Sequence, residues 1–424
     1  TIYLIVIIVI STFLITSESY AKGEYISSNN PNNTTSNNIS TPVSIHGKLS
    51  VTGTNIVDKN NNKFQLRGVS THGIQWFPQY VNQDAFIYMR DEWGINAIRI
   101  AMYSNKNDGY NTNLHEIVKK GINYAKNAGL YVIIDWHILN DGNPNTNKDS
   151  AINFFKEIAN LYKDDINIIY EICNEPNGNV QWERDIKPYA EEVIKEIRNI
   201  DSDAIIVVGT PTWSQDVDIV AQSPINGYEN IMYSLHFYAA THKENLRQKL
   251  EKALNGGLPI FVTEFGICDA SGNGNLDIQE ANIWIDYLNE QNISWISWNL
   301  SNKNESSAIL RNTEKVTDWT YDELSESGKW ILEALKRSNK NQEINDNTEG
   351  NSNNMSDNEN NSNDIDLNEN NNINNDKDSN IIDNKDNSKY IIKIIGIALI
   401  ILILILIFTI YLRQKSKRKK TNRN

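Results

Sequence analysis

Short apolar runs, most of them rich in β-branched residues, recur through the middle of the chain. Each run is almost continuously apolar, which is typical of a parallel strand that is buried on both faces. The pattern predicts strands at Phe64–Val69, Ala97–Ala101, Leu130–Trp136, Ile166–Cys173, Ala204–Val208, Ile231–Phe237, Pro259–Phe265 and Ile293–Asn299.

Segments in which apolar residues recur at helical spacing lie between these runs. They predict helices at Leu114–Ala128, Ala151–Tyr162, Lys187–Ile200, Lys243–Leu254, Ile278–Glu290 and Tyr321–Leu335. Eight strands that alternate with helices across residues 43–337 are what a (β/α)₈ TIM barrel of the α/β class requires. The alternative is an open doubly wound sheet, but no glycine-rich phosphate fingerprint follows the first strand.

The start of the chain has the features of a secretory signal. An apolar run reaches Ile15 and is followed by Ser19-Tyr20-Ala21, a small-x-small cleavage pattern. We therefore expect residues 1–21 to be a signal peptide whose basic leader precedes Thr1. The alternative is an uncleaved membrane anchor. Residues 22–42 are rich in Ser, Asn and Thr, which is typical of a flexible spacer.

The end of the chain predicts an anchor. Residues 338–389 are mostly Asn, Asp, Ser, Glu and Lys, so we expect a disordered linker there. Residues 391–412 form an Ile- and Leu-rich stretch long enough to cross a bilayer as a helix. Residues 413–424 are basic, and by the positive-inside rule this tail is cytoplasmic. The barrel is then expected to be secreted across the cytoplasmic membrane and anchored to its outer face.

Charge and cysteine content exclude some classes of ligand and site. The formal net charge is −13, and it becomes −20 when the seven cationic residues of the tail are set aside. Such an acidic exterior argues against nucleic acid and other polyanions and is compatible with a neutral ligand. Cys173 and Cys268, the two cysteines of the sequence, are too few for a disulfide scaffold and match no metal-binding spacing. We expect both to be buried free thiols.

Two predicted strands end in a glutamate. The first stops at Asn174-Glu175-Pro176, where proline donates no backbone hydrogen bond and disfavours a helical conformation in the residue before it. Glu175 therefore lies at the mouth of a buried strand, a costly place for a carboxylate with a purely structural role. Glu264 ends another strand in the same way. Together the two glutamates predict a two-carboxylate acid/base site.

Other unusual side chains also gather at the carboxyl ends of the predicted strands. In a barrel these ends converge on one face, where active sites are built. Any one of these side chains could be an ordinary core residue, but their shared position predicts a cleft. They are His72, Trp76, Phe77, Arg99, Met102, Tyr103, Asp135, Trp136, His137, Asn174, Trp213, His236, Phe237, Tyr238, Trp298, Lys303 and Glu305.

Opposed glutamates suit the cleavage of a glycosidic bond, in which one acid protonates the leaving oxygen while the other carboxylate attacks or activates water. Trp76, Trp213 and Trp298 offer flat apolar faces to sugar rings. A metal site is the first alternative, but no two of the histidines near the cleft lie at a close ligand spacing. A serine or cysteine nucleophile is the second, but no strand ends in a Gly-x-Ser-x-Gly turn.

Five segments are specific enough to indicate a family. They are Arg-Gly-Val-Ser-Thr-His-Gly-Ile-Gln-Trp (67–76), Ile-Ile-Asp-Trp-His (133–137), Tyr-Glu-Ile-Cys-Asn-Glu-Pro-Asn-Gly (170–178), Ser-Leu-His-Phe-Tyr-Ala (234–239) and Val-Thr-Glu-Phe-Gly (262–266). In this order they resemble glycoside hydrolase family 5, and most of all its bacterial endo-β-1,4-glucanases, or cellulases. The resemblance covers residues 45–335, essentially the whole predicted barrel.

The resemblance implies a (β/α)₈ barrel that hydrolyses β-1,4-glycosidic bonds with retention of configuration and needs no cofactor or metal. It implies Glu175 as the acid/base and Glu264 as the nucleophile. Asn174 would hold the 2-hydroxyl of the sugar that carries the cleaved bond. Arg99 and Tyr238 would position Glu264, with His236 beside the pair. The residues implied to line the glycan subsites are His72, Trp76, Phe77, Tyr103, His137, Trp213, Tyr238, Ala270, Trp298, Lys303 and Glu305.

The sequence departs from the family pattern in a few places. Phe77 stands where these cellulases often have Tyr, Phe265 stands for a common Trp, and Cys173 for a common Ala. The expected membrane anchor is not typical of a freely secreted cellulase, so the natural polysaccharide stays open. We expect a monomeric endoglucanase that acts on a β-glucan. The alternatives are hydrolysis of mixed-linkage glucan or mannan, and a surface glycan-binding protein with an inactive barrel.

Overall fold

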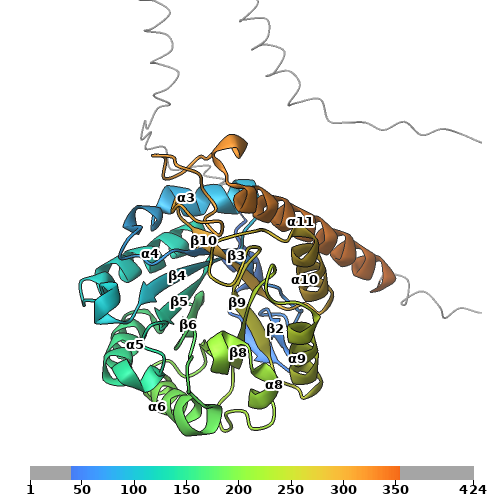
Figure 1. The fold of residues 1–424 in the computed structure, drawn as a ribbon. Coiled ribbons are helices and arrows are strands. Elements are labelled where there is room, and N and C mark those ends of the chain that lie inside the picture. Colours follow the sequence, from blue (N-terminus) through green and yellow to red (C-terminus); the bar gives the residue numbers. More distant parts are fainter. Residues whose placement is uncertain (1–39, 354–424) are drawn as a thin grey trace, which may run out of the picture. The chain divides into compact units, whose positions relative to one another are not determined.

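The computed structural model describes residues 40–353, with side chains to residue 340 (Figure 1). The expected signal peptide, membrane span and basic tail lie outside the described residues. Within residues 40–353, no helix combines the length and the apolar character needed to cross a bilayer.

Eight parallel strands close into a barrel in the order β10-β3-β4-β5-β6-β7-β8-β9, which confirms the predicted fold class. Each strand falls within or overlaps a predicted run, and the ends shift by a few residues. The strands are β3 (Arg67–Thr71), β4 (Ala97–Tyr103), β5 (Tyr131–His137), β6 (Ile168–Glu171), β7 (Ile205–Val208), β8 (Ile231–Tyr238), β9 (Ile260–Gly266) and β10 (Trp295–Leu300).

Helices surround the strands as an outer ring in Figure 1. Their apolar faces pack on the outward-facing residues of the strands and form the largest core cluster. They are α3 (Gln83–Tyr88), α4 (Leu114–Ala128), α5 (Lys148–Tyr162), α6 (Lys187–Arg198), α7 (Pro211–Ser214), α8 (Val217–Val220), α9 (Glu244–Asn255), α10 (Ile278–Glu290) and α11 (Glu326–Asn353). The predicted bounds of α4 and α10 are confirmed to the residue.

The interior of the barrel is layered because side chains alternate inward and outward along each strand. The lower layer is apolar and includes Ala97, Ile133 and Ile169. Two residues further along these strands, the inward-facing residues are Arg99, Asp135 and Glu171, which are fully buried. The polar layer therefore lies directly beneath the carboxyl ends of the strands.

An antiparallel hairpin that the hydrophobic pattern did not predict covers the lower end of the barrel. Its strands are β1 (Ser50–Thr52) and β2 (Asn55–Val57). Leu49, Ile56 and Phe64 from this region pack on the lower interior layer. The hairpin thus separates the barrel interior from solvent at the end opposite the cleft.

Both ends of the barrel domain differ from their predicted boundaries. A short helix, α2 (Pro42–His46), begins inside the expected spacer because the Thr41 side chain accepts a hydrogen bond from the Ser44 amide. The last helix starts later than predicted, since Ser325 Oγ accepts a hydrogen bond from the Gly328 amide at its first turn.

The predicted start of a disordered linker at residue 338 is wrong, since α11 continues to Asn353. Ser338 Oγ accepts a hydrogen bond from Asn289, and Asn339 donates one to the carbonyl of Gly94. Further on, no glycine or proline interrupts residues 329–349, so the helix can propagate without a breaker.

Candidate active site

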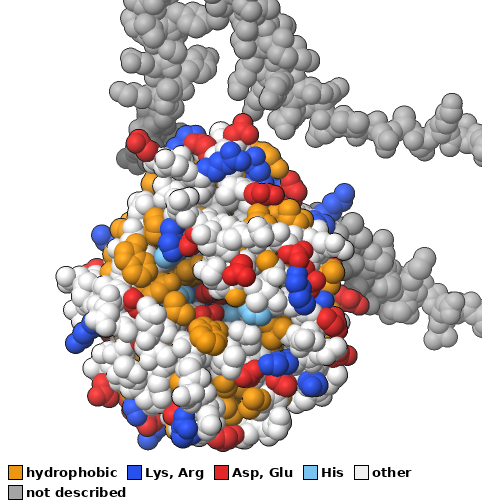
Figure 2. Space-filling model, viewed as in Figure 1, with side chains coloured by type: hydrophobic (Ala, Val, Ile, Leu, Met, Phe, Trp, Pro, Cys, Tyr) orange, Lys and Arg blue, Asp and Glu red, His pale blue; other side chains and the backbone are white. Residues whose placement is uncertain are grey.

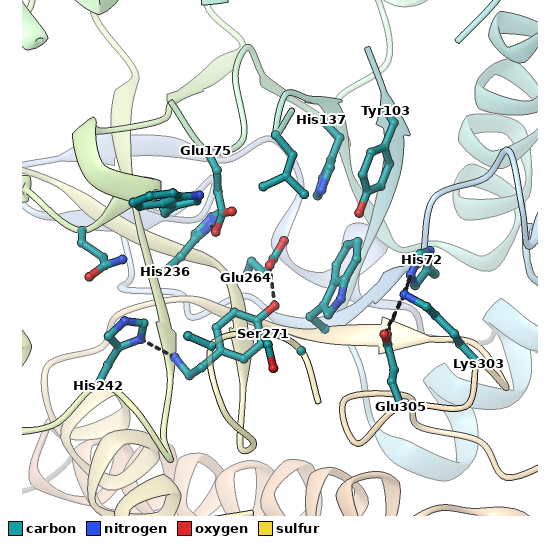
Figure 3. Close-up of a pocket in the computed structure, with 17 residues that line it drawn as sticks. His72, Tyr103, His137, Glu175, His236, His242, Glu264, Ser271, Lys303 and Glu305 are labelled. Atoms are coloured by element: carbon teal, nitrogen blue, oxygen red, sulfur yellow. Dashed lines mark hydrogen bonds and ion pairs between the residues drawn. The ribbon is translucent and has the colours of Figure 1, made fainter. Parts of the chain in front are cut away.

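A cleft of about 510 Å³ opens at the carboxyl ends of the strands (Figure 3). Figure 2 shows it as a hollow in which acidic and histidine side chains are visible between apolar ones. The lining residues are His72, Tyr103, His137, Leu139, Glu175, Trp213, Gln215, His236, Tyr238, His242, Glu264, Ala270, Ser271, Gly272, Trp298, Lys303 and Glu305.

Glu175 and Glu264 lie on opposite sides of the cleft floor, and one carboxylate oxygen of each comes within 4.8 Å of the other. Glu175 follows β6, and Glu264 is on β9. Their exposed fractions are only 8% and 4%. Carboxylates this close suit direct attack by one of them, whereas a wider separation would leave room for a water molecule between sugar and base.

Glu264 is held by two donors. The Tyr238 hydroxyl donates to Oε1 at 2.7 Å, and Arg99 Nη1 donates to Oε2 at 3.2 Å. Burial raises the pKa of Glu264, and the charge of Glu175 raises it further. His236 and Arg99 oppose this rise in pKa but do not overcome it.

Glu175 is in an environment that retains its proton. Burial raises the pKa of Glu175 to about 8; the Arg99 charge opposes this rise, and the charges of Asp135 and Glu171 add to it. Its Oε1 lies 2.9 Å from His236 Nδ1. At neutral pH the carboxyl group can therefore donate a proton, while Glu264, bound by two donors, has the partners of an ionised carboxylate.

Arg99 connects the acidic groups. Its fully buried guanidinium donates from Nε to Glu171 at 2.7 Å and pairs through Nη2 with Asp135 at 2.9 Å. Nη2 also donates to Asn174 Oδ1 at 2.6 Å. With Glu264, three buried carboxylates surround one cation, so none of them is left without a positive partner.

His137 and Asn174 form a second pair of positioned groups. His137 Nδ1 lies 2.6 Å from Asp135 Oδ2, which makes it the donor nitrogen of the ring. Asn174 Nδ2 donates to the Ile138 carbonyl at 3.2 Å and lies 3.3 Å from His137 Nε2. Asn174 is fully buried and does not line the cleft, so its expected sugar contact is not preformed.

Aromatic rings line the cleft or flank it. Trp298 stacks on His137 with ring centroids 5.1 Å apart, and Tyr103 lies edge-on to Trp76 at 4.8 Å. Trp76 and Trp213 are among the few large apolar residues that are exposed, at 47% and 44%. Their exposure shows that these two rings are not part of the barrel core.

Phe77 does not line the cleft. Its ring packs edge-on against His72, which does line the cleft, with centroids 5.0 Å apart. Phe77 therefore contacts His72, a lining residue, and its expected contact with glycan stays a prediction.

A charged group closes one end of the cleft. Lys303 Nζ pairs with Glu305 Oε2 at 2.6 Å and lies 3.3 Å from His72 Nε2. Asn299 and Ser307 both donate to Glu305 Oε1. Burial lowers the pKa of His72 to about 3, and the nearby Lys303 charge lowers it too, so the ring is neutral at pH 7.

The short element α7, which carries Trp213, has an unusual backbone. Thr212, Trp213 and Ser214 have φ values of 59°, 55° and 55°, a left-handed run that is costly for residues other than glycine. Trp213 N donates to the Pro176 carbonyl at 3.0 Å, and Ser214 Oγ donates to the Asn174 carbonyl at 2.7 Å. These bonds tie the turn to the residues on either side of Glu175.

The sequence did not predict several residues of the site. The additional lining residues are Leu139, Gln215, His242, Ser271 and Gly272. The sequence does contain an indication of Glu171, because a carboxylate within an apolar strand requires a buried partner. His242 lies beyond its strand, where Nδ1 accepts a hydrogen bond from the Tyr238 amide.

Within residues 40–340, the group with the geometry to hold a metal is Glu175, His236 and Glu264. All three already have partners, because Glu175 and His236 bond to each other while Arg99 and Tyr238 bind Glu264. These contacts are those of two carboxyl groups and one histidine partner, and they are explained without any of the three residues binding a metal.

Comparison with known proteins agrees with this geometry. Residues 57–304 match the family model described as cellulase (glycosyl hydrolase family 5). The chain belongs to glycoside hydrolase family 5. This family 5 chain is 48% identical over 300 residues to an endoglucanase of Clostridium saccharobutylicum, which covers 70% of this chain and 66% of that protein. It is 48% identical over 299 residues to endoglucanase 5 of Pectobacterium carotovorum, covering 70% and 59%.

Solved structures show the same fold. The cellulase Cel5C_n is 41% identical, with a TM-score of 0.67, and the match covers 70% of the family 5 chain and 94% of that protein. The catalytic domain of Thermobifida fusca endoglucanase Cel5A, as a variant in complex with cellotetraose, is 40% identical with a TM-score of 0.67. That match covers 70% of the family 5 chain and the whole of the domain.

The Arg99→Met variant should be less stable than the wild type by about 3–5 kcal/mol at pH 7, since buried carboxylates lose their cation. Without Arg99, the carboxylates have a higher pKa in the folded state than in the unfolded state. Such a group lowers the free energy of unfolding at pH values above its unfolded-state pKa, and it has no effect at pH values below it. The deficit should therefore shrink as pH falls towards 4.5. Urea unfolding at both pH values measures it.

The matched control is Arg184→Met, because the Arg184 side chain is 59% exposed and its partner Asp185 keeps the hydrogen bonds that it accepts from the Gln181 amide and from Asn143. Its unfolding midpoint should stay near that of the wild type at both pH values. Equal effects of the two substitutions would contradict the role given to Arg99.

Proposed function

We propose that this protein is a retaining endo-β-1,4-glucanase. The observation that carries the proposal is the pair of buried carboxylates within 4.8 Å of each other, in a cleft flanked by exposed tryptophans. The cleft opens on the molecular surface, which suits access to internal bonds of a chain (Figure 2). Membership of family 5 and similarity to proteins named endoglucanases support the same reaction.

In the first step, a carboxylate oxygen of Glu264 forms a bond to the anomeric carbon as the bond from that carbon to the leaving oxygen breaks. Glu175 gives its proton to the leaving oxygen, so the departing sugar leaves as an alcohol. Tyr238 and Arg99 orient Glu264 for the attack. The raised pKa of Glu175 keeps its proton available near neutral pH.

In the second step, Glu264 is a neutral ester, and the loss of its charge weakens the repulsion that it exerts on Glu175. Glu175, now a carboxylate, takes a proton from water as the water oxygen bonds to the anomeric carbon. The ester bond breaks and Glu264 leaves as a carboxylate. Two displacements on opposite faces restore the original configuration.

The remaining site residues would hold the glycan. Trp76, Trp213 and Trp298 offer ring faces to the sugars. Asn174 would reach the 2-hydroxyl after exchanging its bond to the Ile138 carbonyl. The other proposed contacts are His72, Tyr103, His137, Tyr238, Ala270, Lys303 and Glu305. One chain supplies all of these groups, which is compatible with a monomer.

Carboxymethylcellulose, mixed-linkage glucan, mannan and xylan, assayed in parallel, test the substrate. We expect the highest rate of reducing-sugar release on carboxymethylcellulose, with viscosity falling early because internal bonds are cut. A higher rate on mannan or mixed-linkage glucan would show that this polymer is the preferred substrate. If the protein bound these polymers but hydrolysed none of the four, it would be a glycan-binding protein and not an enzyme.

The roles of the two glutamates are separable with an aryl glycoside whose leaving group needs no proton. Glu175→Ala should still form the glycosyl-enzyme from it, and azide should accelerate the slow second step with retention of configuration. Glu264→Ala should fail on the same substrate, since no covalent intermediate can form. If azide instead restored Glu264→Ala with a retained product, the two roles would be reversed.

We also propose that the protein is anchored to the outer face of the cytoplasmic membrane. The support is the sequence of residues 391–424, an apolar stretch followed by seven cations and no acidic residue.

The full chain should sediment with membranes and require detergent for release. A chain that ends after Lys340 should be soluble and equally active, because the described barrel contacts lie within residues 40–340. A soluble full chain would contradict the anchor.

A further inference from the structure

Three buried side chains connect Glu175 to the cation at the centre of the barrel. His236 Nδ1 lies 2.9 Å from Glu175 Oε1, and its Nε2 lies 2.9 Å from Thr263 Oγ1. The Thr263 hydroxyl donates to Glu171 Oε1 at 2.7 Å. Thr263 and Glu171 are fully buried and His236 is 1% exposed, so no solvent competes for these bonds.

The direction of the hydrogen bonds is set at the Glu171 end. Arg99 donates to both oxygens of Glu171, through Nε at 2.7 Å and Nη2 at 3.2 Å, so this carboxylate is an acceptor. The Thr263 hydroxyl therefore gives its proton to Glu171, and its oxygen accepts a hydrogen bond from His236 Nε2–H. Ser234 Oγ lies 2.7 Å from Thr263 Oγ1 and 3.5 Å from Glu171 Oε1, and it can donate its proton to either oxygen without changing this direction.

This direction fixes the tautomer of His236. Burial lowers the pKa of His236 to about 4, so the ring carries one proton at neutral pH. With that proton on Nε2, the lone pair of Nδ1 faces Glu175. A protonated Glu175 can donate a hydrogen bond to that lone pair. An ionised Glu175 cannot, because two hydrogen-bond acceptors would then face each other.

We infer that Thr263 and Glu171 are positioning residues that act through His236 to keep Glu175 in its protonated, proton-donating form. The inference rests on the proposed function, since it assigns these residues to the acid of that reaction. It also explains why a threonine hydroxyl and a fourth carboxylate are buried under a site whose chemistry uses two.

Other charged and titratable groups also face Glu175 and His236 from the surrounding strands. They are Arg99, Tyr103, Asp135, His137, Tyr238 and Glu264. A change of Thr263 alters none of these charges, so its effect on Glu175 reports the hydrogen-bond chain alone. A change of Glu171 removes a charge as well, and is the less specific probe.

The decisive comparison is Thr263→Val against Thr263→Ser. Valine has the shape of threonine without the hydroxyl, so His236 is free to carry its proton on Nδ1 and to donate to an ionised Glu175. Activity falls at high pH as Glu175 loses its proton, so the alkaline limb of the kcat/KM profile should move down by about one pH unit in Thr263→Val. Thr263→Ser keeps the hydroxyl and should keep the wild-type limb.

Two further measurements complete the test. An aryl cellobioside whose leaving group needs no proton should lose much less rate in Thr263→Val than carboxymethylcellulose does. In the wild type, the ¹⁵N spectrum of the His236 ring should show a protonated Nε2 and an unprotonated Nδ1 at neutral pH. This tautomer measurement needs neither activity nor a folded variant.

The outcomes distinguish the inference from the proposed function. If the wild type hydrolyses none of the β-glucans, the proposed function fails. If the wild type is active but Thr263→Val and Thr263→Ser share one alkaline limb, the inference is overturned while the function stands. A proton on His236 Nδ1 in the wild type also overturns it.

Discussion

The guanidinium of Arg99 is the constraint on which this site depends. A fully buried cation is tolerated only with charged partners, and here Asp135, Glu171 and Glu264 provide them from three other strands. Each of these carboxylates in turn depends on Arg99. The polar layer between the apolar lower interior and the cleft is therefore one cooperative unit, and its members cannot be exchanged one at a time without leaving a buried charge unpaired.

The same layer divides the work of two similar residues. Glu175 and Glu264 are both nearly buried, and burial raises the pKa of both. They differ in their partners, because Glu264 receives hydrogen bonds from Arg99 and Tyr238, whereas Glu175 faces a histidine ring. Donors favour a carboxylate, and His236 in the inferred tautomer is an acceptor that favours a carboxylic acid, so hydrogen bonding separates two groups that burial alone would leave alike.

Much of this arrangement could be read from the sequence, and the remainder has physical reasons. Glu175 and Glu264 were recognisable because each interrupts an apolar strand at its carboxyl end, and α4 and α10 because their apolar spacing is unbroken. Glu171 lies inside an apolar run that predicts a strand, and the sequence does not reveal the buried Arg99 that explains its charge. The extension of α11 escaped prediction because composition indicates a lack of core residues, whereas local hydrogen bonding can still continue a helix.

The left-handed turn at Thr212–Ser214 has a consequence for how such a cleft can diverge. Its bonds to the carbonyls of Asn174 and Pro176 join the backbone that carries Trp213 to the backbone on both sides of Glu175. A substitution that relaxes the turn would move the backbone at Trp213 and the backbone around Glu175 together. Variation at this turn would therefore alter one wall of the cleft and the setting of a buried carboxyl group in the same evolutionary step.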